Sequence, residues 1–203
     1  MIGHEDLAND EARKMKTETR ERLSKVSVAT LATLLFKRGL RNQVIQDVRP
    51  LRPGRANMVG EAYTLRYIPA REDLNTIAVF RDPAHPQRAA VEACPPGAVL
   101  VCDSRKDPRA ASAGSILVTR LMRRGVAGFV TDGGLRDAFD IGQLDFAAYC
   151  NRPSPPTNLT LHHAIEANVP IGCGDVAVFP GDVLVGDSDG VIDDGNAFIA
   201  GGN

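Results

Sequence analysis

Hydrophobic and polar residues follow several different periods along this chain, and each period predicts a different element. Residues 10–25 are rich in Glu, Lys and Arg, which favours a solvated helix. Ser27 then precedes an apolar stripe at helical spacing that stops at Gly39, so a capping serine and a terminal glycine agree on a packed helix. Residues 58–68 are β-prone, and Pro69 is expected to end that strand.

Two short, continuous apolar runs predict strands that are covered on both faces. The first spans residues 98–102 and the second spans residues 126–131. Between them, a loop over residues 104–113 leads to a helix that begins near Ser115 and should bury Leu117, Leu121 and Met122. This order of elements predicts a right-handed crossover, with ligands bound beyond the carboxyl ends of the strands.

The remaining segments predict a mixture of helices and short strands. Helices are expected over residues 75–80, 87–93 and 159–167, with a stiff, extended linker over residues 152–157. Short strands joined by Gly and Pro turns are expected near Val169, Val176, Val183 and Val191. The chain is therefore expected to be an α/β protein whose final third forms a β-layer.

The composition indicates that function resides in a local site. The chain has 203 residues without a composition break or repeat, so we expect one domain over residues 1–203, with a polar helical extension over residues 1–26. Its 25 acidic and 24 basic residues create no net field that would recruit nucleic acid or an anionic membrane. The four cysteines lack CxxC spacing, which predicts reduced thiols, and no apolar run approaches the ~20 residues that span a bilayer. We expect a cytoplasmic protein that binds neither nucleic acid directly nor membrane.

A glycine-led helix start offers one half of a candidate site. Helix N-termini carry unpaired backbone N–H groups that attract carboxylates. The residues that would present these groups are Gly114, Ser115, Ile116 and Leu117. Taken alone, the stretch is better explained as an ordinary helix start with Ser112 or Ser115 as its cap.

Arg136 and Asp137 offer the other half, because they follow the second buried strand at the end where ligands bind. Gly133 and Gly134 are expected to free the backbone before them. An Asp oxygen is a hard ligand that Mg²⁺ prefers, and Arg is a rigid, two-pronged anion clamp. A surface ion pair or a helix cap is the alternative interpretation of the same dipeptide.

Other candidate chemistry is weaker. No phosphate loop and no complete dinucleotide fingerprint is present, so nucleotide cofactors are disfavoured. Residues 187–198 lack the closing Glu of a calcium loop, and a tight turn is expected there. His162 and His163, taken to lie on a helix, would point about 100° apart and could not chelate one ion together. Lys106 alone could serve as a Schiff-base lysine, so a divalent ion is the better electron sink for carbon–carbon bond chemistry.

Several of these segments, taken in order, resemble the RraA-like family, which includes regulators of ribonuclease activity A and class II 4-hydroxy-4-methyl-2-oxoglutarate aldolases. The similarity extends from about residue 27 to residue 192. The segments that carry it are residues 60–64 (GEAYT), the helix start at Gly114, residues 125–137 with their Asp132-Gly133 and Arg136-Asp137 pairs, and residues 180–191.

The resemblance implies a swivelling β/β/α domain, in which a layered sheet is flanked by helices. It also implies a homotrimer or hexamer with the active site at the subunit boundary. In the family's aldolases, pyruvate chelates Mg²⁺ or Mn²⁺ while backbone N–H groups hold its carboxylate. By motif, Asp137 would be the metal ligand and Arg136 the catalytic clamp for substrate and enolate. The helix start at residues 114–117 would hold the substrate carboxylate.

The chain departs from the family pattern in two places. Ser115 stands where the motif, an acidic residue followed by twenty spacers and Arg-Asp, has its acid, so a charge near the metal is missing. The family's C-terminal helix, which supplies an acidic residue to a neighbouring subunit, is expected to be absent; Asp193 or Asp194 could replace that residue.

These expectations favour a divalent-metal-dependent lyase that cleaves 4-hydroxy-2-oxo acids to pyruvate or decarboxylates oxaloacetate, since both reactions pass through pyruvate enolate. Two alternatives remain open at this point. One is a non-catalytic protein that binds and regulates a ribonuclease of the RNase E type, and the other is an inactive scaffold.

Overall fold

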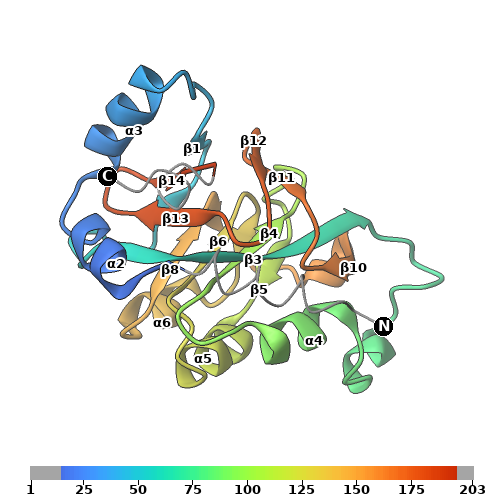
Figure 1. Cartoon of the computed structure of the whole chain (residues 1–203). Helices are drawn as coiled ribbons and strands as arrows, with labels where there is room; N and C mark the ends of the chain where they lie inside the picture. Colours follow the sequence, from blue (N-terminus) through green and yellow to red (C-terminus); the bar gives the residue numbers. More distant parts are fainter. Residues whose placement is uncertain (1–14, 196–203) are drawn as a thin grey trace, which may run out of the picture.

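A computed structural model describes residues 15–195 of the chain (Figure 1). Within that range a nine-stranded sheet has the spatial order β1-β14-β13-β3-β4-β6-β8-β2, with β10 also paired to β3. The strands of this sheet are β1 Val44–Ile45, β2 Arg49–Pro50, β3 Met58–Pro69, β4 Val99–Asp103, β6 Gly128–Thr131, β8 Ala147–Cys150, β10 His162–Ala167, β13 Val183–Gly186 and β14 Val191–Asp193. Strands β3, β4, β6 and β8 are mutually parallel, and the other pairings are antiparallel.

The long strand β3 joins the two halves of the sheet. Its first residues, from Met58 to Glu61, pair with β13, and its later residues pair with β4 on one side and with β10 on the other. The strand reaches Pro69, one residue beyond the predicted end, because its last residues pair only with β10, where a missing N–H is tolerated at the strand end.

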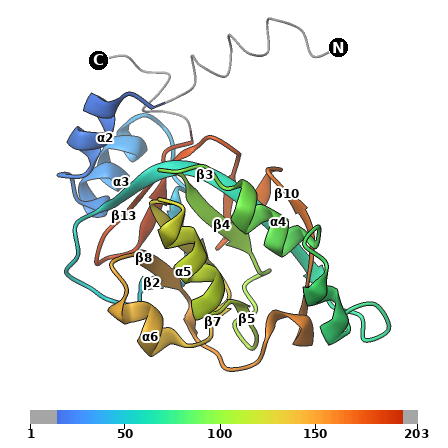
Figure 2. The ribbon, with the colours of Figure 1, turned by 90° about the horizontal axis from the view of Figure 1, so that it is seen from below.

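Helices cover one face of the sheet and a β-hairpin covers the other (Figures 1 and 2). The helices on the first face are α4 Pro86–Ala93, α5 Ser115–Arg123 and α6 Ala138–Gln143. The hairpin consists of β11 Ile171–Cys173 and β12 Val176–Val178. Two further helices, α2 Thr17–Leu23 and α3 Val28–Lys37, pack beside β13 and β14. This layered α/β architecture confirms the predicted fold class.

Each layer buries its own apolar cluster. Leu100, Phe129 and Leu121 lie in the cluster between the sheet and α4, α5 and α6. Val99 and Val101, which point to the opposite face of β4, pack with the β11–β12 hairpin. Alternate side chains of one strand thus pack into two different apolar clusters, as expected for a sheet that is covered on both faces.

Several predicted elements are confirmed. Helix α3 begins after Ser27, whose side chain accepts a hydrogen bond from the Thr30 backbone, and Gly39 adopts a positive φ just beyond its end. The two buried strands appear as β4 and β6. Helix α5 starts at Ser115 as predicted, although its buried residues are Val118 and Leu121, while Leu117 and Met122 are only partly buried.

The predicted helix over residues 159–167 is wrong. A short 3₁₀ helix, η2 Asn158–Thr160, is followed by strand β10, which pairs antiparallel with the end of β3. Local spacing favoured a helix, but the open edge of β3 offers backbone hydrogen bonds that the sequence pattern cannot reveal. His162 and His163 therefore point to opposite faces of a strand, and they still do not converge on one ion.

Two other segments differ from expectation. Residues 75–80 form no α-helix, and the 3₁₀ helix η1 Ile77–Arg81 occupies that region. The expected linker at residues 152–157 begins with a strand, β9 Arg152–Pro153, which joins β5 Ala111–Ala113 and β7 Gly134–Leu135 in a small parallel sheet. None of the helices in residues 15–195 is both long enough and apolar enough to cross a bilayer. The predicted start of the N-terminal helix and the expected absence of a C-terminal helix lie outside the described residues.

Candidate active site

The small parallel sheet brings the two predicted halves of the site together. Ala113 of β5 pairs with Leu135 of β7, and the Arg136 backbone N–H donates to the Ala113 carbonyl at 3.1 Å. Both strands run in the same direction, so the residues that follow them, Gly114 and Arg136, emerge side by side. Residues 114 and 136 are distant in sequence, and this three-stranded sheet fixes their separation.

Asp137 lies directly against the N-terminus of α5. Its Oδ2 accepts hydrogen bonds from the Ser115 backbone N–H at 3.1 Å and from the Ser115 hydroxyl at 3.0 Å. The Arg136 Nε lies 3.9 Å from the same oxygen. The Ser115 N–H, the Ser115 hydroxyl and then Arg136 lower the pKa of Asp137, so the carboxylate is ionised at neutral pH.

The backbone at Asp137 is in the left-handed region, with φ 56° and ψ 35°. Few non-glycine residues adopt this conformation, although Asp tolerates it better than most. The turn directs the side chain back toward α5. A left-handed Asp that faces a helix N-terminus is the kind of local outlier that often accompanies a functional site.

Gly114 is required by packing rather than by its backbone angles. Its φ is −125°, which any residue can adopt, but a Cβ at this position would lie 2.8 Å from the Arg136 Cγ and 3.0 Å from the Asp137 Oδ2. The absence of a side chain lets the helix start approach the Arg136-Asp137 pair. It also leaves α5 without a side-chain cap, so Ser112 and Ser115 do not cap it.

Gly133 and Gly134 serve a different purpose from the one expected. Neither has a positive φ. A Cβ on Gly133 would lie 2.6 Å from the Ser104 Cβ, and one on Gly134 would lie 2.5 Å from the Ser154 Cβ. These glycines therefore allow the strand that carries Arg136 to pack closely against its neighbours.

A buried group of hydroxyls lies below this strand. The Ser112 Oγ is 2.7 Å from the Ser104 Oγ and 2.6 Å from the Thr131 Oγ1. Thr131 also accepts from the Gly133 N–H at 3.0 Å. This network ties the ends of β4, β5 and β6 together beneath the candidate site.

Asp132 is a structural anchor that the sequence reasoning did not single out as a site residue. It is fully buried and accepts from three backbone N–H groups, those of Ser104 at 2.6 Å, Lys106 at 3.0 Å and Gly174 at 3.2 Å. Burial raises the pKa of Asp132 to about 6 despite these donors. The carboxylate holds the loop after β4 against the β11–β12 turn.

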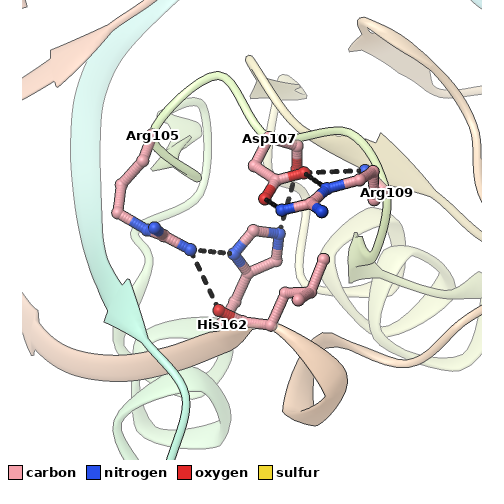
Figure 3. Close-up of polar contacts among 5 residues, drawn as sticks. Arg105, Asp107, Arg109 and His162 are labelled. Atoms are coloured by element: carbon pink, nitrogen blue, oxygen red, sulfur yellow. Dashed lines mark hydrogen bonds and ion pairs between the residues drawn. The ribbon is translucent and has the colours of Figure 1, made fainter.

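The loop after β4 has a second anchor in His162 of β10 (Figure 3). The Arg105 Nη2 lies 3.1 Å from the His162 Nδ1, and the His162 Nε2 lies 3.1 Å from the Asp107 carbonyl. Because Arg can only donate, Nδ1 accepts and Nε2–H donates. Burial, and then Arg105, lower the pKa of His162, which is consistent with a neutral ring. His162 is therefore a structural residue here.

The candidate site opens into a cleft with a volume of about 610 Å³. Residues of α4, β5 and α5 line it, together with Arg136, Asp137 and the segment at Thr157 and Asn158. Two large apolar side chains on the flanking helices, Ile116 of α5 and Phe139 of α6, are 83% and 79% exposed.

The structure argues against the alternative chemistry. The Lys106 ammonium is exposed and forms an ion pair with Asp175 at 2.6 Å, which raises its pKa, whereas Schiff-base formation needs a lowered pKa. Asp193 and Asp194 are fully buried in the chain, and their serving a neighbouring site stays a prediction. Asp187 accepts from the Val28 N–H at 2.8 Å, in keeping with a structural turn rather than a calcium loop.

The residues around Asp137 fit a magnesium or manganese ion. Mg²⁺ in enzyme sites commonly takes one or two carboxylates and fills its remaining positions with water and substrate oxygens. Asp137 supplies one ionised carboxylate at the mouth of an open cleft, and Ser115 orients it through Oδ2. Such a hydrogen bond to a ligand carboxylate is the usual arrangement around a bound metal.

Residues 24–192 match the family model described as RraA-like, Aldolase/RraA. The chain belongs to the RraA-like family. Over 86 residues it is 37% identical to a Halalkalibacterium halodurans protein named "Putative 4-hydroxy-4-methyl-2-oxoglutarate aldolase". That match spans 42% of this chain and 40% of the relative.

Solved structures of the family share the fold. RraAS2 of Streptomyces coelicolor, described as an unusual member of the RNase ES inhibitor RraA protein family, has a TM-score of 0.78 and 28% identity, covering 92% of this chain and 91% of its own. The RNA-processing inhibitor RraA from Thermus thermophilis has a TM-score of 0.62 and 24% identity, covering 83% of this chain and 92% of its own. The second likeness bears on the fold alone.

Proposed function

We propose that this RraA-like protein is a divalent-metal-dependent lyase that releases pyruvate from 4-hydroxy-2-oxo acids of the 4-hydroxy-4-methyl-2-oxoglutarate type, and that it can also decarboxylate oxaloacetate. The observation that carries the proposal is the contact between the Asp137 carboxylate and the N-terminus of α5, with Arg136 beside it. A hard-metal ligand, a cation and a carboxylate-binding helix start thus meet at the mouth of one cleft.

Asp137, the helix start and Arg136 would each have a different role in the reaction. Asp137 would hold Mg²⁺ or Mn²⁺, which, when bound, polarises the keto group of the substrate. The Ser115 N–H already donates to Asp137. The neighbouring backbone N–H groups of Gly114, Ile116 and Leu117 would orient the substrate carboxylate, since helix N-termini favour anions. Arg136 would stabilise the negative charge that develops on the keto oxygen as the carbon–carbon bond breaks.

The substrate's leaving part would occupy the rest of the cleft. Arg88 and Arg120 also line this cleft, and Glu92 pairs with Arg120 at 2.7 Å. A dicarboxylic substrate would find cationic groups there. No carboxylate or imidazole of this chain other than Asp137 and Glu92 lines the cleft within residues 15–195, so we assign proton transfer to ordered water.

The test is an assay of pyruvate release from 4-hydroxy-4-methyl-2-oxoglutarate and from oxaloacetate, with Mg²⁺ and with chelator. We expect turnover only with the ion, and we expect Asp137→Ala to abolish it. Turnover that survives in chelator or in Asp137→Ala would overturn the roles of the ion and of this residue.

We further propose a homotrimer or hexamer whose subunit contacts cover the apolar side chains beside the cleft. Ile116 and Phe139 are largely exposed, and exposed side chains of this size on adjacent helices commonly mark a protein interface. Light scattering coupled to size exclusion tests this proposal. A monomer at micromolar concentration would contradict it.

A second candidate function is regulation of a ribonuclease of the RNase E type by direct binding, without catalysis. It is supported by the likeness to RraAS2 over most of both chains. Purified protein should then reduce cleavage of an RNA substrate by such a ribonuclease, and Asp137→Ala should do so equally well. Lyase turnover without any effect on the ribonuclease would decide for the enzyme, and the absence of both activities would favour the inactive scaffold.

A further inference from the structure

Three aspartates form a buried cluster that lies outside the candidate active site. Carboxylate oxygens of Asp182, Asp193 and Asp194 all lie within 4.8 Å of one another. Asp182 is 6% exposed and the other two are 0% exposed. None of the three lines the cleft that contains Asp137.

The β13–β14 hairpin creates this cluster. Leu184 of β13 pairs with Asp193 of β14. Asp182 directly precedes β13 and Asp194 directly follows β14, so both lie at the open end of the hairpin, beside Asp193. Two hydrogen bonds close that end, from the Asp194 N–H to the Val183 carbonyl at 3.0 Å and from the Val183 N–H to the Asp194 Oδ1 at 2.8 Å.

Backbone donors fix the orientation of the other two carboxylates. The Phe179 N–H donates to the Asp182 Oδ2 at 2.7 Å, and the Gly195 N–H donates to the Asp193 Oδ1 at 2.8 Å. The site is therefore pre-organised by main-chain contacts, and the side chains do not need to be ordered when a ligand arrives.

The second oxygen of Asp193 is the exception. The Asp193 Oδ2 is buried and has no hydrogen-bond partner among residues 15–195, and neither Asp193 nor Asp182 forms an ion pair within that range. Buried polar atoms are almost always satisfied, and an unpaired buried carboxylate oxygen is especially costly.

We propose that the Asp182, Asp193 and Asp194 carboxylates form a second site, for a hard divalent cation such as Ca²⁺ or Mg²⁺. All the donors in the cluster are oxygens, which these ions prefer over the nitrogen and sulfur ligands of zinc or copper. Carboxylate oxygens that lie within 4.8 Å of one another can all contact one such ion, because its oxygen ligands lie about 2.0 to 2.6 Å from it.

The cation would lock the end of β14 to the turn before β13. The unpaired Asp193 oxygen would become a ligand of the ion, and the ion would neutralise part of the negative charge of the three carboxylates. Its role is structural, because the cluster does not touch the cleft.

The experiment separates this site from the proposed active site. Calorimetric titrations with CaCl₂ and with MgCl₂ are carried out on the full chain carrying Asp137→Ala, on Asp137→Ala with Asp193→Asn, and on Asp137→Ala with Asp189→Asn. Asp189 is an exposed carboxylate in the turn between β13 and β14, at the other end of the hairpin, and serves as the matched control. The melting temperature of each protein is measured with chelator and with added CaCl₂.

We expect Asp137→Ala to retain one binding site and to melt at a higher temperature with CaCl₂ than with chelator. Asp193→Asn should weaken this binding by more than about 10-fold, because affinity in all-oxygen sites depends on the number of charged ligands. Asp189→Asn should leave the affinity unchanged.

Two results would overturn the proposal. One is the absence of residual binding in Asp137→Ala together with no effect of CaCl₂ on its melting temperature. The other is unchanged binding in the Asp193→Asn protein, which would place the ion elsewhere. Both results leave the function of Asp137 untouched, since that residue is absent from every protein in the titration.

Discussion

The Asp137 carboxylate accepts two hydrogen bonds from Ser115 through a single oxygen, one from the backbone N–H at 3.1 Å and one from the hydroxyl at 3.0 Å. Ser115 stands where the family motif has an acidic residue. The contact shows that its side chain lies against the proposed metal ligand. The lost charge is thus partly replaced by a hydroxyl that orients Asp137.

Ser115→Asp should strengthen metal binding. A carboxylate in contact with Asp137 adds negative charge where the proposed ion sits, and changes of this kind alter affinity by roughly 10- to 100-fold. Ser115→Ala is the matched control, and it should weaken binding because it removes the hydroxyl that orients Asp137. Titration with MnCl₂, followed by electron paramagnetic resonance, measures both effects. An unchanged or weaker affinity in Ser115→Asp would show that the missing charge is irrelevant.

Gly114→Ala should damage the site while leaving the fold intact. The added Cβ would lie 2.8 Å from the Arg136 Cγ and 3.0 Å from the Asp137 Oδ2, so Arg136 and Asp137 must move. Displacements of about 1 Å in a catalytic group can cost on the order of 100-fold in rate. We expect a loss of this size in kcat/KM for pyruvate release, with a circular dichroism spectrum like that of the wild type. Full activity in the variant would contradict the proposed use of this helix start.

Arg136→Lys and Arg136→Ala should separate charge from geometry. Arg136→Ala removes the group that is proposed to stabilise charge on the keto oxygen, and losing one such group costs about 100- to 1,000-fold in kcat. Arg136→Lys keeps the positive charge but loses the planar fork, so it should fall between alanine and wild type. Steady-state assays at saturating Mg²⁺ measure both. Equal activity in all three proteins would remove Arg136 from the mechanism.

Asp132→Asn should change how stability depends on pH. Burial raises the pKa of Asp132 to about 6 in the folded protein, above its ordinary value near 3.8. Between these values the folded state binds more protons than the unfolded state, so this residue makes stability fall as pH rises from about 4 to about 6. At about 1.4 kcal/mol per pKa unit, the effect is roughly 3 kcal/mol.

The asparagine side chain cannot titrate. Its NH₂ group would also face backbone N–H groups that need an acceptor. The variant should therefore be less stable than wild type at pH 4, and the gap should narrow by pH 7. Urea unfolding at several pH values measures the difference. Parallel curves for the two proteins would contradict the raised pKa.

Much of the fold could be read from short-range patterns. The apolar runs that became β4 and β6 and the capped stripe of α3 depend on burial and on backbone chemistry within about ten residues, which the sequence contains directly. The sequence also predicts that Arg136 and Asp137 lie beyond the end of a buried strand, because the apolar run before them is local in the sequence. The resemblance then assigned them roles, and the structure shows that they lie against Gly114.

The errors have a common origin in contacts between distant segments. Residues 162–167 have helical spacing, yet they form β10 because the edge of β3 was available for pairing. Gly133 and Gly134 were expected to free the backbone, but they are required by side chains twenty or more residues away.

The sequence by itself determined strands β4 and β6, helices α3 and α5, the balance of charge and the chemistry available at residues 114–117, 136 and 137. Only the tertiary structure decided that Asp137 contacts Ser115, that Asp132 is an anchor, and that Asp182, Asp193 and Asp194 converge in a buried cluster. The reason is physical. Local periodicity encodes which face of an element is buried, whereas the partner that each polar side chain meets depends on strand order, and strand order is set by the packing of the whole chain.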